Sequence, residues 1–486
     1  MPERDIELFI RDYVNDIKAG SAALFAGAGL SIPAGFVSWK ELIGDIAYEL
    51  GLDIEKESDL ISLAQYHLNE KGNRHKINQK IITEFAEQAE ETENHRIIAR
   101  LPIASLWTTN YDDLIEKTYA RYNRVCDVKT TPESLTNNIH KRDVVLYKMH
   151  GDYRTPNQAI ITREQYETYS RTHLPFINML MAELTAKTFL FIVIGFSFED
   201  PNLQYVLSRL YAQYGEGKRN HYCIMRRVQP GDSGSEDQAS YDYNSRKQSL
   251  MINDLRRYGI QTLLVEDYRQ ITDLLYAIET QFKKSTVFIS GSADNYHPYA
   301  REESIQFIHR LARLLIRKQY RIVNGFGWGV GTAVINGALE AIYASGGKIS
   351  ESQLVLRPFP QFASGGITLP ALWHEYRQNM ISLSGIAVFL FGNKRNAEGE
   401  CVLADGLLKE FHIAAEQGCV CIPIGCTGGA SAEIYRKIKE EMKDTLYHRH
   451  PVAMNLLDQL NEPGSLAEKK TCLLALIDII TKDNPR

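Results

Sequence analysis

Ala22-Ala23-Leu24-Phe25-Ala26 runs directly into Gly27-Ala28-Gly29-Leu30-Ser31, and the architecture of the first half of the chain follows from this junction. A short apolar run that ends in a glycine turn is typical of a buried strand. Ligands of open α/β sheets bind just beyond the carboxyl ends of the strands, where glycines let backbone amides approach a phosphate. A plain tight turn explains the same glycines, so the motif alone leaves both interpretations open.

Two further polar motifs each follow a run of apolar residues. They are Thr108-Thr109-Asn110-Tyr111-Asp112-Asp113 and His150-Gly151-Asp152. Because the carboxyl ends of parallel strands meet at one edge of a sheet, we expect the glycine turn, Asn110 and His150 to lie together. A phosphate cradle, an amide and an imidazole at one edge suit a nucleotide and chemistry performed on it.

Each of these polar residues also has a structural interpretation. Asn110 can bind a ribose hydroxyl or a water, but Asn is also a favoured N-cap of a following helix. The imidazole of His150 can act as a general base near neutral pH, although an arbitrary histidine is more often structural. Ser197, within Gly195-Phe196-Ser197-Phe198-Glu199-Asp200-Pro201, is placed to meet a phosphate or a ribose. Asp200 as an N-cap before Pro201 explains the same loop, and both interpretations can hold together.

The order of apolar and polar segments predicts a Rossmann-like, parallel, doubly wound sheet in the first half of the chain. A charged, mostly helical stretch from Trp39 to about Arg100 forms an insertion after the first strand. The polar segment from Gln229 to Asn244 is expected to be a surface loop, and residues 271–282 a closing helix. The remaining strands are expected near residues 103–107, 144–149, 189–195, 221–225 and 259–265.

A second pattern of strand and small residues begins after Lys283-Lys284-Ser285. Val287 to Ser292 is expected to be its first strand, and an amphipathic helix follows over about residues 301–318. Further strands are expected near residues 320–323, 353–356, 386–391 and 419–424. We therefore predict two α/β domains, residues 1–283 and 284–486, of which the second is also Rossmann-like.

Gly325-Phe326-Gly327-Trp328-Gly329-Val330-Gly331 places four glycines at alternate positions before a predicted helix. This density exceeds what a turn requires and favours an anion cradle at the helix N-terminus over a purely structural role. Gly291 and Ser292 end the first strand of the same domain and are expected to face the same ligand. Arg377 and Lys394 are the candidates to neutralise phosphates, but a single basic residue is most often a solvated surface charge.

Composition restricts the classes of function. A formal net charge of -5 over 486 residues gives no basic footprint for nucleic acid. The charged start lacks an apolar signal core, and the longest apolar run falls short of the roughly 18–20 residues that span a bilayer. We therefore expect a cytoplasmic protein with no nucleic-acid or membrane partner. Seven scattered cysteines without a Cys-x-x-Cys pair argue against a zinc ribbon, so no metal is expected.

Taken together, the motifs of the first half resemble those of the SIR2 (sirtuin) family over roughly residues 5–282. The glycine turn, the Thr-Thr-Asn-Tyr-Asp run, His150-Gly151 and Gly195-Phe196-Ser197 have the family's order and its placement at strand ends. The resemblance implies that NAD is the substrate, that His150 is the catalytic histidine, and that Asn110 and Asp112 face the nicotinamide ribose. It implies further NAD contacts from Gly27, Ala28, Gly29 and Ser31 at the pyrophosphate and from Ser197 at the far half.

The chain departs from the sirtuin deacylases because their four zinc cysteines are missing. This departure disfavours protein deacylation and favours the bacterial SIR2 proteins that cleave NAD. Residues 284–486 resemble the SLOG family of nucleotide-sensing domains, on Val287 to Ser292 and Asn324 to Gly331. A SIR2 domain followed by a SLOG domain is similar to the effectors of the Thoeris antiphage system.

That similarity implies an NAD hydrolase that depletes NAD in antiphage defence by abortive infection. A TIR-domain partner protein would make a cyclic ADP-ribose isomer that activates the enzyme. The isomer would bind the SLOG domain at Gly291, Ser292, Gly325, Gly327, Gly329, Arg377 and Lys394. Higher-order assembly gives SIR2 effectors a means of control, and we expect a homotetramer. Two other classes stay open, an NAD-dependent protein deacylase and a non-catalytic nucleotide-sensing assembly module.

The bond to be cleaved in such an enzyme joins nicotinamide to C1′ of the ribose. Nicotinamide leaves as a neutral molecule, so no acid is needed, and the barrier lies in the oxocarbenium-like state at the sugar. We expect His150 to act as the general base on water or on a ribose hydroxyl, and Asn110 to position that water and the sugar.

Overall fold

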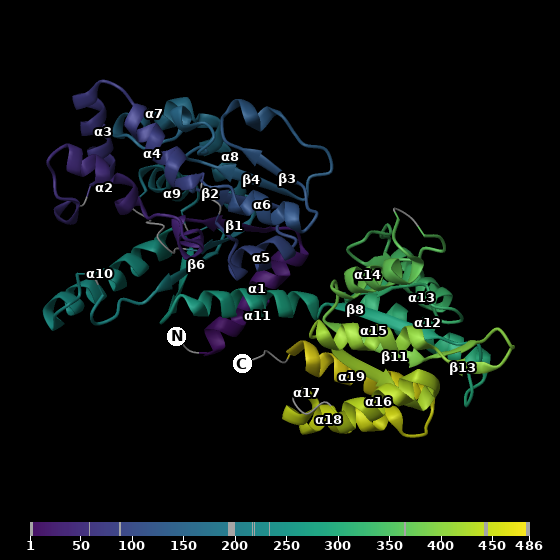
Figure 1. The fold of residues 1–486 in the computed structure, drawn as a ribbon. Coiled ribbons are helices and arrows are strands. Elements are labelled where there is room, and N and C mark those ends of the chain that lie inside the picture. The colour runs from purple at the N-terminus through teal and green to yellow at the C-terminus, as the bar shows by residue number, and fades with distance from the viewer. Residues whose placement is uncertain are drawn as a thin grey trace. The chain divides into compact units, whose positions relative to one another are not determined.

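The computed structural model describes residues 3–57, 59–86, 89–192, 200–215, 217, 219–232, 234–363, 366–441 and 446–482. The chain forms two compact units, residues 1–279 and 280–486 (Figure 1). Each unit has its own parallel sheet. The predicted division, between residues 283 and 284, falls at the end of helix α11 (Arg269–Lys283), which runs through the boundary.

The first unit is built on a seven-stranded parallel sheet with the strand order β3-β4-β2-β1-β5-β6-β7. Every residue of β1, β2, β4 and β5 is buried, which is why these strands read in the sequence as nearly continuous apolar runs. The seven strands are β1 (Ala22–Ala26), β2 (Ser105–Thr108), β3 (Cys126–Lys129), β4 (Val144–Lys148), β5 (Thr188–Ile192), β6 (His221–Arg226) and β7 (Ile260–Val265).

Strand β1 lies at the point where the strand order changes direction. Its residue Leu24 is in register with Leu106 of β2 on one side and with Leu190 of β5 on the other. The carboxyl end of β1 is therefore a topological switch point, where the ligand crevice of a doubly wound sheet opens. The turn over residues 27–31, which includes the 3-10 helix η1 (Ala28–Leu30), lies at this position.

A helical insertion separates β1 from β2. It comprises α2 (Trp39–Glu49), α3 (Leu60–Lys71), α4 (His75–Phe85) and α5 (Glu93–Arg100). Figure 1 shows α2, α3 and α4 close to α7 (Arg163–Thr172), and the insertion has its own apolar cluster, which includes Phe36, Leu63 and Phe85. The other helices of the unit are α1 (Glu3–Lys18), α6 (Leu114–Arg121), α8 (Leu174–Ala186), α9 (Pro201–Tyr214) and α10 (Gln238–Arg257).

The sequence analysis misses β3 and the start of α10. β3 has the sequence Cys-Asp-Val-Lys, a four-residue alternation that is too short to distinguish from a loop. The prediction of a surface loop over residues 229–244 is wrong for its last part, because α10 begins at Gln238. Asp237 caps this helix by accepting a hydrogen bond from the Ser240 amide, and Leu255 is its buried residue, so no apolar period marks the helix.

The second unit is built on a five-stranded parallel sheet with the order β10-β9-β8-β11-β14. The central strand β8 pairs with β9 on one side and with β11 on the other, so a second switch point lies near Gly291 and Ser292. The strands are β8 (Thr286–Ser292), β9 (Arg321–Asn324), β10 (Leu354–Leu356), β11 (Ile386–Phe391) and β14 (Val420–Ile424). Each of them lies where the sequence predicts a strand.

Helices and a small hairpin complete the second unit. The antiparallel hairpin of β12 (Asn393–Arg395) and β13 (Cys401–Leu403) follows β11. The helices are α12 (Arg301–Arg317), α13 (Gly331–Ala344), α14 (Leu369–Ile381), α15 (Asp405–Glu416), α16 (Gly429–Glu441), α17 (Leu446–Arg449), α18 (Pro451–Asn461) and α19 (Leu466–Lys482). None of the described helices combines the length and the apolar character required to cross a bilayer.

Candidate active site

Asn110 ties the loop after β2 to the turn after β1. Its side-chain Nδ2 donates to the carbonyl oxygen of Gly27 and to Oγ of Ser31, both at 3.0 Å. It does not cap the next helix, because Asp112 accepts the hydrogen bond from the Leu114 amide at 3.0 Å. The Oδ1 atom of Asn110 is buried and has no hydrogen-bond partner among the described residues. Asn110 therefore presents one free acceptor at the switch point.

His150 follows β4, the strand next to β2. The Met149 amide donates to the Thr108 carbonyl at 2.9 Å, and this hydrogen bond holds the two loops side by side. Gly151 has a φ of +89°, and a Cβ at this position would lie 3.2 Å from Cα of Ala159. Glycine is therefore required directly after the histidine. The His150 side chain is buried, and its Nε2 lies 3.3 Å from Oδ2 of Asp200.

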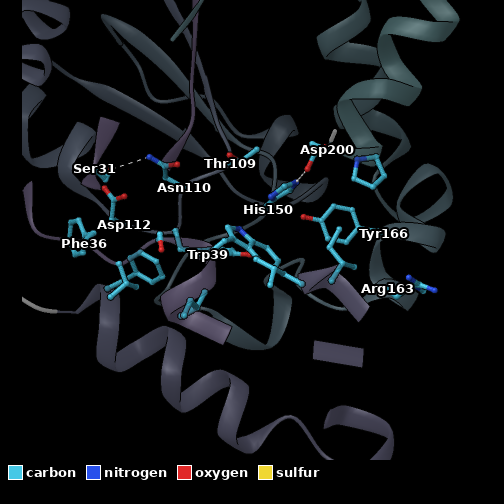
Figure 2. A pocket seen from close by; sticks show the side chains of 18 of the residues that line it. Ser31, Phe36, Trp39, Thr109, Asn110, Asp112, His150, Arg163, Tyr166 and Asp200 are labelled. Atoms are coloured by element: carbon cyan, nitrogen blue, oxygen red, sulfur yellow. Dashed lines mark hydrogen bonds and ion pairs between the residues drawn. The ribbon is translucent and has the colours of Figure 1, made fainter. Parts of the chain in front are cut away.

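Asn110 and His150 line the same cavity, which has a volume of about 580 Å³ (Figure 2). This volume lies within the range of ligand sites, about 300–1,000 Å³. Polar groups gather at the end formed by the sheet, and the helical insertion supplies an apolar wall. The wall residues are Phe36, Trp39, Leu42, Leu60, Ile61 and Phe85.

The structure brings together four of the residues predicted to contact NAD. Ser31, Asn110, Asp112 and His150 all line the cavity. Gly27 and Gly29 belong to the adjoining turn without lining the cavity, Ala28 lies in the same turn, and Ser197 lies outside the described residues. The functional assignments of all these residues stay predictions.

The sequence does not predict the apolar wall of the site. It predicts Asp200 only as a helix cap. Asp200 lines the cavity beside His150, so the cap residue also belongs to the site. The signal in the sequence is that Asp200 closely follows the apolar run at residues 189–195. For the wall, Phe36 and Trp39 follow the glycine turn closely in sequence, but their packing depends on α3 and α4.

Burial sets the protonation state of the His150 imidazole. Removal from water lowers the pKa of His150 below its usual value, and the charge of Asp200 acts in the opposite direction. His150 is therefore neutral near pH 7 and able to accept a proton. Burial raises the pKa of the neighbouring phenols Tyr166 and Tyr169, so these groups are neutral as well.

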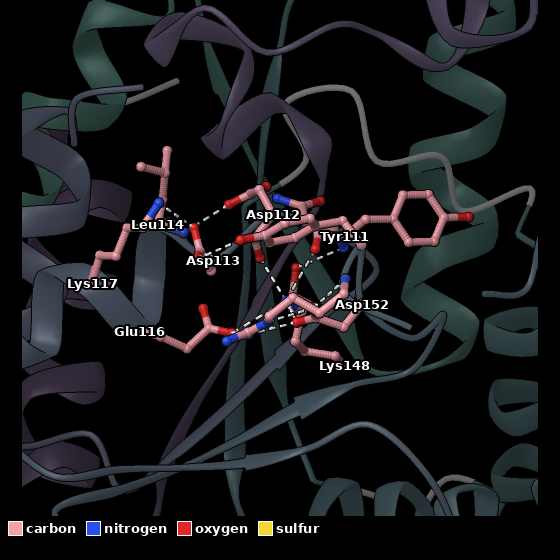
Figure 3. A network of polar contacts seen from close by, with 12 residues as sticks. Tyr111, Asp112, Asp113, Leu114, Glu116, Lys117, Lys148 and Asp152 are labelled. Atoms are coloured by element: carbon pink, nitrogen blue, oxygen red, sulfur yellow. Dashed lines mark hydrogen bonds and ion pairs between the residues drawn. The ribbon is translucent and has the colours of Figure 1, made fainter. Parts of the chain in front are cut away.

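A buried polar network supports the loops that carry Asn110 and His150 (Figure 3). Lys148, the last residue of β4, has no exposed side-chain surface. Its Nζ donates to the Tyr111 and Asp112 carbonyls at 3.2 and 2.6 Å. It also contacts Oδ2 of Asp152 at 2.5 Å and Oε1 of Glu116 at 3.2 Å. One ammonium thus holds the loop after β2 against the loop after β4.

In the second unit, the glycines after β9 lie against the loop after β8. A Cβ on Gly327 would lie 1.9 Å from the Gly291 carbonyl oxygen. Gly329 has a φ of +72°, and a Cβ there would lie 2.1 Å from the Ala293 carbonyl oxygen. Close backbone packing therefore requires these glycines. An anion-binding role for them stays a prediction.

Arg377 and Lys394 each lie beside a residue of the first turn of α15. Lys394 forms an ion pair with Asp405, the first residue of that helix. A Cβ on Gly406 would lie 3.2 Å from Nη2 of Arg377. The Arg377 side chain is 13% exposed and its Nε lies 3.4 Å from Oε1 of Glu410, so Arg377 is not a freely solvated charge.

The fold and the cavity define a two-domain nucleotide-binding protein with reactive side chains at the switch point of its first sheet. Residues 104–248 match the family described as SIR2-like domain, and residues 270–482 match the Sir2- and TIR-associating SLOG family. The resemblance to these two families is thereby confirmed.

Relatives align over nearly the whole chain. An NAD(+) hydrolase ThsA of Bacillus cereus (strain MSX-D12) is 44% identical, covering 98% of both chains. The proteins of the same name from Enterococcus faecium and Acinetobacter baumannii (strain 532279) are 40% and 39% identical. These alignments cover 99% and 95% of this chain and 100% and 96% of the relatives. The chain belongs to the ThsA family of SIR2–SLOG proteins.

Proposed function

We propose that this chain hydrolyses NAD at the bond between nicotinamide and the ribose, releasing nicotinamide and ADP-ribose. The observation that carries the proposal is the convergence of Asn110 and His150 in one cavity at the switch point of the first sheet. The relatives at 39–44% identity, which are named NAD(+) hydrolases, support the same reaction. NAD is the substrate, and the described residues contain no group of three or more His, Cys, Asp or Glu suited to a metal ion.

The geometry suits a hydrolysis that needs a base and no acid. Nicotinamide departs as a neutral molecule while positive charge develops on the ribose. Water adds its oxygen to C1′ and loses a proton, which the neutral imidazole of His150 accepts. The free Oδ1 of Asn110 accepts a hydrogen bond from that water or from a ribose hydroxyl. The apolar wall limits the access of other nucleophiles.

The test is an assay of nicotinamide release by the purified full-length chain, with NAD alone and with a panel of ADP-ribose derivatives. We expect low release with NAD alone and a rise with a cyclic ADP-ribose isomer. No release under any condition would contradict the proposal. An acetyl-lysine peptide in the same assay tests for a deacylase, which would form deacetylated peptide.

The pH dependence of turnover follows from the burial of His150. A base must be unprotonated to act, so activity falls as the pH drops through its pKa. Because burial lowers that pKa, we expect the acidic midpoint of kcat to lie below about 6.5, the ordinary pKa of histidine. Nicotinamide release measured from pH 5 to 8, with the melting temperature recorded at each pH, checks this. An acidic midpoint at or above pH 6.5 would contradict it.

We propose that the second unit controls the first by binding a cyclic ADP-ribose isomer, made by a TIR-domain partner protein. Two cations that lie beside the first turn of a helix suit the phosphates of such a ligand. The matched family is described as Sir2- and TIR-associating, which supports a TIR-domain partner. We further propose a homotetramer, and a role in antiphage defence through depletion of NAD.

Arg377→Ala is expected to raise the isomer concentration for half-maximal activation at least about tenfold, because charge-assisted hydrogen bonds contribute about 1.5–3 kcal/mol. The KM for NAD should stay unchanged, since the substituted residue belongs to the second unit. Activation curves for the wild type and the variant measure the effect. Arg310→Ala, an exposed substitution on α12, is the matched control and should behave as the wild type. Equal activation of the Arg377 variant would remove this residue from the ligand site.

A further inference from the structure

Asp200 caps a helix with one carboxylate oxygen and faces the imidazole of His150 with the other. Its Oδ1 accepts hydrogen bonds from the amides of Asn202 at 3.0 Å and Leu203 at 2.9 Å, in the first turn of α9. Its Oδ2 lies 3.3 Å from Nε2 of His150 (Figure 2). The same side chain therefore has a structural contact and a contact in the cavity.

The capping contact fixes the direction of the carboxylate. Two backbone amides of the first helical turn bind one carboxylate oxygen, so the side chain is held in one orientation. Pro201 at the first helical position presets the backbone of that turn. The position of Oδ2 is thus set by α9 before any ligand binds. A group held in this way loses little freedom when the site assembles.

Besides Asp200, the described titratable groups in contact with His150 or next to it are Tyr166, Tyr169 and His173. The Tyr166 ring contacts the imidazole edge-on, with ring centroids 5.4 Å apart. Tyr169 donates its hydroxyl to the Met149 carbonyl at 3.0 Å. Burial lowers the pKa of His173, whose ring stacks on Tyr169, so this imidazole is uncharged near pH 7. Among the described side chains, Asp200 is the carboxylate within ion-pair distance of His150.

We propose that Asp200 is a positioning residue for the cleavage of NAD, an inference that rests on the proposed function. It holds the His150 imidazole with Nε2–H toward its carboxylate, which leaves Nδ1 as the proton acceptor. The hydrogen bond made by one ring nitrogen decides which tautomer is present. Neither ring nitrogen makes an aligned hydrogen bond to a described residue, but Nε2 is the nitrogen that faces the Asp200 carboxylate at 3.3 Å, which leaves Nδ1 available to accept a proton. The 3.3 Å contact is an ion-pair separation that shortens as the imidazole gains its proton.

Asp200→Asn separates the two contacts of this side chain. Asparagine caps a helix as well as aspartate does, so α9 keeps its cap while the negative charge is removed. We expect kcat to fall at least about 100-fold. The KM for NAD should stay within threefold of the wild-type value, and the melting temperature should be unchanged. The acidic limb of the pH profile should move to lower pH, because the charge that raises the His150 pKa is gone.

Asp237→Asn is the matched control, since Asp237 caps α10 by accepting from the Ser240 amide at 2.7 Å. It should retain wild-type kcat and the wild-type pH profile. A purely structural role for Asp200 predicts the same retention for Asp200→Asn, and that result would overturn the proposal. Serine at position 200 keeps a cap without a carboxylate, so Asp200→Ser should lose kcat to the same extent.

A second readout does not depend on turnover. Nitrogen-15 spectra of the full-length chain labelled at histidine, with the His150 signals assigned by His150→Gln, report the tautomer in the absence of NAD. We expect an unprotonated Nδ1 in the wild type and a protonated Nδ1 in Asp200→Asn, because Oδ1 of the asparagine keeps the cap and its Nδ2 faces Nε2 as a donor. A proton on Nδ1 in the wild type would overturn the inference. If the wild type shows no NAD turnover, the proposed function fails, while these spectra still decide the role of Asp200.

Discussion

His150→Ala is expected to reduce nicotinamide release by at least about 100-fold, and by up to about 10,000-fold, while the protein stays folded. The cavity offers no second neutral imidazole among its lining residues to replace the lost base. The substitution also leaves the fold intact, because neither ring nitrogen makes an aligned hydrogen bond to a described residue. Chromatographic assay of nicotinamide, together with thermal unfolding, measures both effects. His140→Ala, at an exposed position of the same unit, is the control and should match the wild type.

Asn110→Ala should cause a similar loss of turnover with a moderate cost in stability. The amide donates to two buried acceptors, the Gly27 carbonyl and Ser31 Oγ, which lose a donor when it is removed. Such a loss costs about 1–3 kcal/mol, which a folded domain with about 5–15 kcal/mol of stability survives. Asn253→Ala on the exposed side of α10 is the matched control. Ordinary turnover in either active-site variant would remove that residue from the proposed mechanism.

The parts of the fold that the sequence predicts are those encoded by local composition. β1, β4 and β11 are buried along their whole length, so their apolar runs give the strand bounds to within a residue. β3 alternates over four residues and α10 has Leu255 as its buried residue, so neither presents a period long enough to identify. Local pattern therefore predicts buried elements and misses those that are short or mostly solvated.

The sequence likewise predicts only part of the candidate site. Polar residues placed after apolar strands predict that Asn110 and His150 share one edge, because parallel strands end together. The contact of Asp200 with His150 joins positions 50 residues apart in the sequence, and it depends on the angle at which α9 enters. The apolar wall depends on how α2, α3 and α4 pack around Phe36 and Phe85. Such contacts come from tertiary packing, which no local motif contains.

The glycine-rich run after β9 shows that a motif can be placed correctly from the sequence while the reason for its glycines is seen only in the structure. The run from Gly325 to Gly331 lies at the end of a strand and before a helix, as expected. In the structure, Gly327 and Gly329 are required because the loop after β8 passes within van der Waals distance of them. Sequence alone does not distinguish a backbone that approaches a phosphate from one that approaches another backbone.

Lys148→Met is expected to be the most destabilising of these substitutions, lowering the free energy of unfolding by about 3–5 kcal/mol. Lys148 is fully buried, and its removal leaves Asp152 and Glu116 facing each other without the intervening ammonium. The hydrogen bond from Arg154 to Asp152, at 2.8 Å, remains and places the expected loss toward the lower end of that range. The Tyr111 and Asp112 carbonyls also lose their donor, so the loop that carries Asn110 loosens and turnover falls with stability.

Urea unfolding of the full-length variants measures this effect, and Lys56→Met is the matched control. Lys56 pairs with Asp53 at 3.1 Å with 81% of its side chain exposed, and such surface pairs contribute at most about 1 kcal/mol. The double variant Lys148→Met with Asp152→Asn should recover part of the lost stability, because one of the two buried charges is removed with the ammonium. If Lys148→Met unfolded at the same urea concentration as Lys56→Met, the network in Figure 3 would not hold the two active-site loops together. The network would then contribute no more to the free energy of unfolding than a solvated ion pair does.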